Sequence, residues 1–367
     1  MKKNLRNLLV LGLGLMTTVS FAQDWDVDSR TRIDMSGDYD RMETNQRTII
    51  GTTWGGSDWG IHLSTEANVD LGLSGNVHLN LVEAYASTDL MGYASLTVGR
   101  QALSYGSGNL IGVNDWGSRV GQTRDAMVFG VDNDMADLTL MYASRYNGDS
   151  LTTGGSAWAI NAAKEDGDWN VNVLYGSQSV TVLDEDGDAE TFMGLDAGYD
   201  LMGGALSLGL SYNTYSWDDG ESVDEDMMSL SATYSVNDDM SVSVTRSAYG
   251  EEGFYVDGGS MAVYGTNDAW ATHGNMGHLG ANQVGLSVGA DYNMGDFNIS
   301  AGVHRVSDET EDTEGSTMYA DYERSAMNLN LGYTLSDNAN VSLMYATDDY
   351  GTDTDSKYMY VTINIRP

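Results

Sequence analysis

Five histidines are the side chains of this sequence best suited to general acid–base chemistry or metal binding: His62, His78, His273, His278 and His304. Apart from a loose pair at 273 and 278, none has a partner at the helical or hairpin spacing that metal sites use. The sequence also contains no Gly-x-Ser-x-Gly elbow, phosphate-binding loop or zinc motif. We therefore expect a protein that is not an enzyme, with no catalytic residues and no bound cofactor.

Acidic residues outnumber basic ones by 54 to 17, which gives a formal net charge of −37. Such a chain repels nucleic acid, so nucleic acid is not expected as a partner. The acidic cluster Asp184–Asp188 is faintly similar to a calcium loop, but it lacks the twelve-residue spacing and closing Glu of that motif. We interpret it as an acidic hairpin tip, and weak calcium binding at acidic outer loops is the one cofactor possibility that we retain.

The elements that position these charges begin after a secretory signal. Lys2, Lys3 and Arg6 precede a short apolar run over 8–16, and Ser20-Phe21-Ala22 ends the segment with small residues where a signal peptidase reads. We predict a signal peptide over 1–22 and a single domain over 23–367. The run is too short to be a membrane helix, and the rest of the chain contains no stretch of eighteen or more apolar residues.

The remainder of the chain alternates between apolar and polar residues, with a period of two, in segments of about ten residues. In the first segment Trp25, Val27 and Ile33 share one face. The charges opposite them, and one from a later segment, are predicted to face a lumen: Asp26, Asp28, Arg30, Arg32 and Glu66. The only proline is Pro367 and there is no cysteine, so almost every position can pair within a sheet.

Short Gly- and Asp-rich turns alternate with longer acidic loops along the chain. This pattern predicts an all-β fold, a transmembrane antiparallel up-and-down β-barrel with about 18 strands, or 16 if two weak hairpins are miscounted. A soluble secreted all-β sandwich or a solenoid adhesin is the alternative. Aromatic residues near strand ends and charged faces opposite the apolar ones favour the membrane barrel.

Two of the long loops carry residues that are unusual for a solvated surface. Loop 105–122 contains Leu110, Ile111, Val113 and Trp116, and we predict that it folds into the lumen as a constriction. Loop 251–281 is aromatic and contains His273 and His278. We interpret it as a plug or lid packing on its own side chains, with a sugar-stacking platform as the alternative.

The stretch from Leu96 to Met127 contains a strand ending in Gly-Arg-Gln, a Tyr-Gly pair, a short apolar segment, Asp-Trp, basic residues and Arg-Asp. This stretch resembles the alginate-export family of outer-membrane barrels. The matching positions are Gly99, Arg100, Gln101, Tyr105, Gly106, Leu110, Ile111, Asp115, Trp116, Arg119, Arg124 and Asp125, and Glu83-Ala84-Tyr85 resembles an upstream strand of the family. The resemblance implies the same strand number and a lumen in which arginines guide an acidic polysaccharide.

The candidate residues for such a constriction are Arg100, Asp115, Trp116, Arg119, Arg124, Asp125 and Arg145. Strand parity predicts that Arg124 and Arg145 face the lumen. Arg100 shares the face of Val98 and would meet lipid, so we expect either a bulge at Gly99 that re-aims it or a position at the rim, and Glu83 poses the same problem. For each arginine, pairing with a neighbouring carboxylate is the alternative to a role in guiding solutes.

Our first hypothesis is a channel in the outer membrane of a Gram-negative bacterium for passive passage of hydrophilic solutes, ions and sugars, with loop 105–122 as the constriction. A dedicated exporter of an acidic polysaccharide and a non-transporting surface adhesin are the alternatives. The expected partners are outer-membrane lipid and either small solutes or a polysaccharide, and the chain is expected to be a monomer or a homotrimer.

Overall fold

The computed structural model describes residues 22–36, 42–72, 78–113, 122–146, 154–182, 185–218, 222–254, 273–277, 279–308, 323–351 and 356–367. The predicted signal peptide therefore lies outside the described residues, except for Ala22. Within this part of the chain no helix is long and apolar enough to cross a membrane. The helix η1 (Met202–Gly204) is a single turn between two strands.

The described residues form eighteen strands that belong to one sheet. They are β1 (Ala22–Asp34), β2 (Glu43–Gly55), β3 (Trp59–Leu71), β4 (His78–Asp89), β5 (Ser95–Ala102), β6 (Thr123–Val131), β7 (Asp137–Tyr146), β8 (Gly154–Asp166), β9 (Trp169–Val182), β10 (Glu185–Leu201), β11 (Leu206–Asp218), β12 (Ser222–Asn237), β13 (Met240–Tyr249), β14 (Gln283–Met294), β15 (Phe297–Asp308), β16 (Glu323–Ser336), β17 (Ala339–Asp349) and β18 (Ser356–Ile365).

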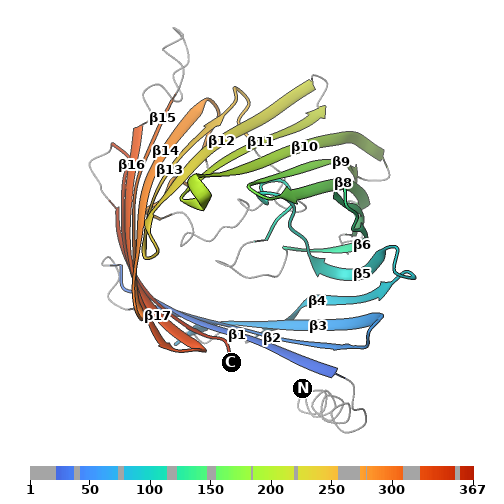
Figure 1. Cartoon of the computed structure of the whole chain (residues 1–367), viewed down its shortest axis with the longest axis horizontal. Coiled ribbons are helices and arrows are strands. Elements are labelled where there is room, and N and C mark those ends of the chain that lie inside the picture. Colours follow the sequence, from blue (N-terminus) through green and yellow to red (C-terminus); the bar gives the residue numbers. More distant parts are fainter. Residues whose placement is uncertain are drawn as a thin grey trace.

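Each strand pairs antiparallel with its neighbours in sequence, and the sheet closes because β1 also pairs with β18. Figure 1 shows the closed wall seen down the barrel, with the start of β1 and the C-terminus at the lower edge. Closure leaves no strand edge unpaired in lipid, which is the condition for a sheet to span a bilayer. The predicted all-β up-and-down barrel is confirmed, with eighteen strands rather than sixteen.

The two rims of the barrel differ in loop length, as the sequence predicts. Short turns such as 56–58, 167–168 and 238–239 lie at the same rim as the start of β1 and the end of β18. We call this the short-turn rim. The opposite, long-loop rim carries the connections from β5 to β6 and from β13 to β14, and parts of both turn into the barrel.

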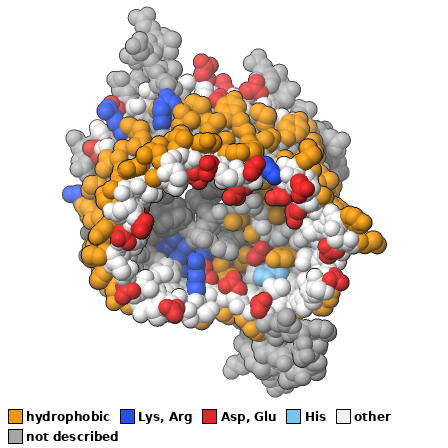
Figure 2. All heavy atoms as spheres, in the orientation of Figure 1, with side chains coloured by type: hydrophobic (Ala, Val, Ile, Leu, Met, Phe, Trp, Pro, Cys, Tyr) orange, Lys and Arg blue, Asp and Glu red, His pale blue; other side chains and the backbone are white. Residues whose placement is uncertain are grey.

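Alternation separates an apolar outer face from a polar inner face. On β7, Leu138, Leu140 and Tyr142 are exposed, whereas Met141 and Ala143 are buried. Figure 2 shows hydrophobic side chains around the outside of the barrel and charged side chains within it. The exposed apolar residues are therefore the lipid-facing surface, and the residues between them face the lumen.

A bulge in β4 changes the alternation at one point. Ser64 of β3 pairs with Glu83, and the next residue Thr65 pairs with Leu81, so Val82 is an extra residue in β4. Val82 is almost fully buried while Leu81 is exposed, and Glu83 contacts inward-facing side chains of β3. The bulge thus turns Glu83 into the lumen, which strict parity assigned to lipid.

Candidate pore lining

The segment 103–113, which follows β5, runs inside the barrel and docks on the inner face of β10 and β11. The backbone N–H of Ser107 donates to Asp196 Oδ2 of β10 at 2.9 Å, and Asn109 Nδ2 donates to Ser211 Oγ of β11 at 3.2 Å. The hydroxyls of Ser107 and Ser211 also lie 3.1 Å apart. The partners lie about a hundred residues further along the chain, so the barrel brings this contact together.

Apolar burial accompanies these hydrogen bonds. Leu110 and Ile111 are exposed to only 1% and 0%. They belong to a cluster of buried side chains that lines the inner wall between β6 and β15 and includes Met141, Leu174, Phe192, Tyr215 and Met227. This explains the apolar residues that the sequence places in loop 105–122: they cover an apolar patch of the inner wall.

The base of the segment is fixed by the β4 bulge. Ala102 N donates to Glu83 Oε1 at 2.9 Å, where β5 ends and the chain turns inward. Burial raises the pKa of the Tyr105 phenol to about 12, and the positive charge of Arg124 opposes this shift with a smaller effect. Tyr105 is thus neutral at physiological pH, and Arg124 lies near it on the lumen side, in register with Gln101.

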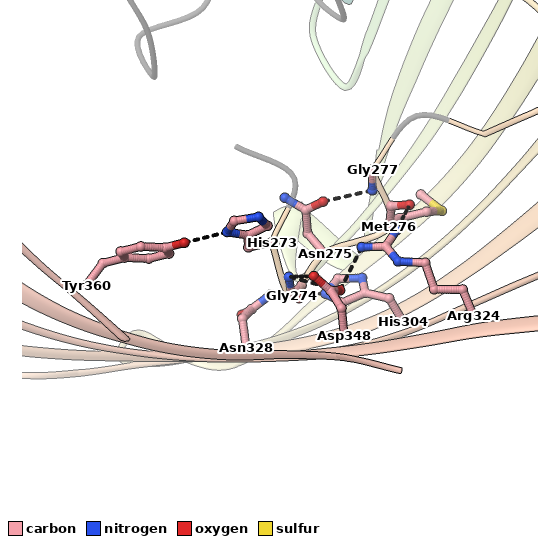
Figure 3. A network of polar contacts seen from close by, with 10 residues as sticks. All are labelled: His273, Gly274, Asn275, Met276, Gly277, His304, Arg324, Asn328, Asp348 and Tyr360. Carbon is pink, nitrogen blue, oxygen red and sulfur yellow. Dashed lines mark hydrogen bonds and ion pairs between the residues drawn. The ribbon is translucent and has the colours of Figure 1, made fainter. Parts of the chain in front are cut away.

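A second segment, 273–277 with 279, reaches the inner wall from the β13–β14 connection. The backbone N–H of Gly274 donates to both oxygens of Asp348 at 3.2 Å, and Asn328 Nδ2 donates to Gly274 O at 2.7 Å. Figure 3 shows this segment on the lumen side of the wall, with Arg324 and Asp348 pointing toward it. The described residues of this segment pack on the barrel wall. The rest of loop 251–281, which we interpreted as packing on its own side chains, lies largely outside the described residues.

Four arginines on the inner wall are buried, whereas the inward Arg124 is half-buried. Arg30 and Arg32 of β1 and Arg47 of β2 face inward at adjoining positions, and Arg47 is 0% exposed. Arg47 Nη2 lies 3.2 Å from Asp28 Oδ2, which also contacts Arg366 at 3.1 Å. Another inward arginine, Arg324, is paired with Asp348 at 2.7 Å. All four guanidinium groups are buried, and those of Arg47 and Arg324 are paired with carboxylates.

Carboxylates, in contrast, are exposed on the inner face near the short-turn rim. Parity places five of them there, each beside buried inward residues of its own strand and each exposed: Asp26, Asp137, Glu165, Asp200 and Asp291. We call these five the acidic mouth. Figure 2 shows carboxylates spaced around the inner edge of the opening and basic side chains inside it. The closed wall thus has a charged inner face, and two segments fold inward against it.

Comparisons with known proteins agree with this geometry. The family model described as Gram-negative porin matches residues 9–354. The chain belongs to the Gram-negative porins. It is an outer-membrane channel for passive passage of solutes, as the sequence predicts. The match supports the porin class and not the alginate-export family in particular.

Solved porin structures share the fold. OccK3 (OpdO) of Pseudomonas aeruginosa has a TM-score of 0.69 and 14% identity, covering 98% of this chain and 99% of that chain. OccK1 (OpdK) of the same organism has a TM-score of 0.69 and 13% identity, covering 95% and 100%. OccK8 (OprE) gives 0.65 and 13%, covering 94% and 98%. The search of curated proteins found no match.

In this porin the predicted constriction residues do not all face the lumen. Arg100 and Asp125 pair at 2.8 Å, with side chains 41% and 54% exposed. They share the outer face with Val98 and Met127, because the pairing of β5 with both neighbours runs in regular register through Gly99. The Arg100–Asp125 pair therefore lies on the lipid-facing side. The bulge that we expected at Gly99 in β5 is absent there, and a bulge occurs in β4 at Val82. Arg124 faces inward.

Other candidates lie at or beyond the limit of the described residues. Asp115, Trp116 and Arg119 are outside them. Arg145 lies in β7, where its backbone pairs with Gly155, but its side chain is not among those described. Of the predicted strand charges, Asp26, Asp28, Arg30, Arg32 and Glu66 all lie on the inner face, and all but Asp26 are buried.

The sequence reasoning did not single out several inner-face residues of this porin. They are Arg47, Arg324 and Asp348 on the wall, and Asp137, Glu165, Asp200 and Asp291 at the mouth. A signal was present for Asp137, Asp200 and Asp291, because each lies one position from an outward apolar residue, as Asp137 does beside Leu138. Glu165 lies between Lys164 and Asp166 and had no such signal. The pairing of Arg324 with Asp348 had no such local signal, because the two residues lie on different strands.

Proposed function

We propose that this porin is a narrowed, cation-preferring channel for small cationic and neutral solutes. The observation that carries the proposal is the contrast between its inner charges: the acidic mouth is exposed, whereas the inner-wall arginines Arg30, Arg32, Arg47 and Arg324 are buried. Rings of carboxylates concentrate cations and repel anions in channels. A guanidinium group paired with a carboxylate carries little net charge, so the Arg47–Asp28 and Arg324–Asp348 pairs contribute little field to the passage.

The segment 103–113 supports the narrowing. It runs inside the barrel and covers the inner wall at β10 and β11, so the free cross-section is smaller than the barrel itself. A large polymer is a poor fit for such a passage. An acidic polysaccharide would also meet five exposed carboxylates at the mouth, which argues against the exporter hypothesis.

The reversal potential in a planar bilayer under a KCl gradient tests the proposal. We expect wild type to prefer K⁺, and the variant with Asn or Gln at all five acidic-mouth positions to move toward equal permeability of K⁺ and Cl⁻. The experiment belongs at low salt, because the Debye length is about 10 Å at 0.1 M and shorter above it. An anion-preferring wild type would overturn the proposal.

A matched control neutralises five carboxylates that lie in turns of the same rim. These are Asp58, Asp134, Asp168, Asp239 and Asp296. If the control lowers K⁺ preference as much as the acidic-mouth variant does, general surface charge and not the inner ring sets selectivity.

A further inference from the structure

Arg324 and Asp348 join the wall to the second inward segment. Asp348 is fully buried, and its carboxylate accepts the Gly274 N–H and one N–H of Arg324 at 2.7 Å. A different nitrogen of the same guanidinium, Nη1, donates to Met276 O at 3.0 Å. Arg324 comes from β16 and Asp348 from β17, so two adjacent strands hold both ends of one short segment (Figure 3).

The backbone of this segment packs directly against the wall at Gly274. Gly274 has a φ of +69°, and a Cβ built on it would lie 2.5 Å from Ala346 Cβ and 2.6 Å from Met327 O. Only glycine accepts both that conformation and that contact. Beside it, the His273 ring stacks on Tyr358 of β18 with centroids 3.5 Å apart, and His273 Nδ1 contacts the Tyr360 hydroxyl.

The barrel does not need these contacts to close. Main-chain pairing of β16 with β17 runs from Ser325 opposite Asp349 to Ser336 opposite Ala339, independently of the segment. A buried ion pair is in general a weak source of stability, but removing one partner leaves an uncompensated buried charge. Stabilising the wall is therefore a poor explanation for the Arg324–Asp348 pair. Holding the segment that docks on the wall explains it better.

We propose that Arg324 and Asp348 are positioning residues that latch segment 273–279 against the inner wall and so fix the width of the open channel. This inference rests on the proposed channel function but concerns a different set of residues from the acidic mouth. Without the latch the segment leaves the wall and occupies variable positions in the lumen, which changes both the mean conductance and its uniformity.

Single-channel recording on Asp348→Asn and Arg324→Gln tests the latch. We expect loss of the single open level of wild type and a spread of conductance levels, with cation preference unchanged. His273→Ala gives an independent variant, because it alters the segment and leaves the strands intact. Glu323→Gln is the matched control: it breaks the Arg305–Glu323 pair, 2.6 Å long and 66% and 65% exposed, on the outer face of β15 and β16.

Proteinase K added to the folded barrels, with the cleavage sites read by mass spectrometry, gives a readout that does not depend on conduction. We expect cleavage between 273 and 282 in the three latch variants and protection in wild type and Glu323→Gln. Uniform conductance and full protection in all three variants would overturn the latch. A non-conducting wild type whose variants still gain the cleavage would instead refute the channel proposal and retain the latch.

Discussion

Truncating the two most buried side chains of segment 103–113 should release it from the wall and change the channel. Leu110 and Ile111 are the apolar anchor, exposed to 1% and 0%. Replacing each buried Leu or Ile by Ala costs about 2–5 kcal/mol, so the double variant loses about 4–10 kcal/mol. We therefore predict that Leu110→Ala with Ile111→Ala undocks the segment while the barrel remains closed.

The hydrogen bonds that would remain are weaker than this loss. The hydrogen bonds to β10 and β11 that remain are the Ser107 N–H bond to the Asp196 carboxylate and the two contacts of Ser211 with Ser107 and Asn109. Leu103 and Tyr105 also keep their packing at the base of the segment. Charged acceptors contribute about 1.5–3 kcal/mol and neutral pairs about 0.5–1.5 kcal/mol each, so together they supply about 2.5–6 kcal/mol. The conformational entropy of a free segment also opposes docking.

The assay is single-channel conductance combined with the heat-dependent shift of folded barrels in gel electrophoresis. We expect a normal heat shift and a higher, noisier conductance. The control is Leu138→Ala with Leu140→Ala, two exposed leucines on the lipid-facing side of β7. If the Leu110/Ile111 variant folds and conducts like wild type, segment 103–113 does not narrow the passage and the reasoning is wrong.

Two further predictions concern the base of this segment. Burial raises the pKa of Tyr105 to about 12, above the usual value of about 10. The contribution of the buried neutral phenol to folding stability is therefore complete below pH 10 and is lost as pH rises through 12. The ultraviolet difference spectrum between wild type and Tyr105→Phe should show a phenolate transition near 12, whereas a transition near 10 would mean that the ring is solvated. Deleting Val82 should leave a folded barrel, because alternation then runs from Leu81 directly to an inward Glu83. Deleting Ala86 should prevent the heat shift, because it moves part of β4 to the wrong face, and equal folding of the two deletions would argue against the bulge.

Period-two alternation was sufficient to predict the wall. The strand count and the inward faces of Asp28, Arg30 and Arg32 follow from it, because lipid accepts one kind of side chain and water another. Parity also assigned Arg100 to the outer face, and the structure agrees with parity and not with the pore-lining role that the resemblance implied.

What parity could not predict depends on local irregularity or on contacts between distant residues. The bulge at Val82 adds one residue without any Gly or Pro to mark it, so the face of Glu83 could not be assigned. The burial of Leu110 and Ile111 was predictable from their type. Their partner surface on β10 and β11 was not, because it exists only after the barrel closes.

The net charge of −37 acquires a function only once the barrel geometry is known. A lipid-facing wall admits few charges, so an excess of 54 acidic over 17 basic residues must lie at the turns, the loops and the lumen. Inside, the arginines Arg47 and Arg324 are enclosed with carboxylate partners, and this leaves unpaired acids as the charges that water reaches. The cation preference that we propose therefore depends on which inner charges are exposed, and the total composition sets only the sign of the excess charge.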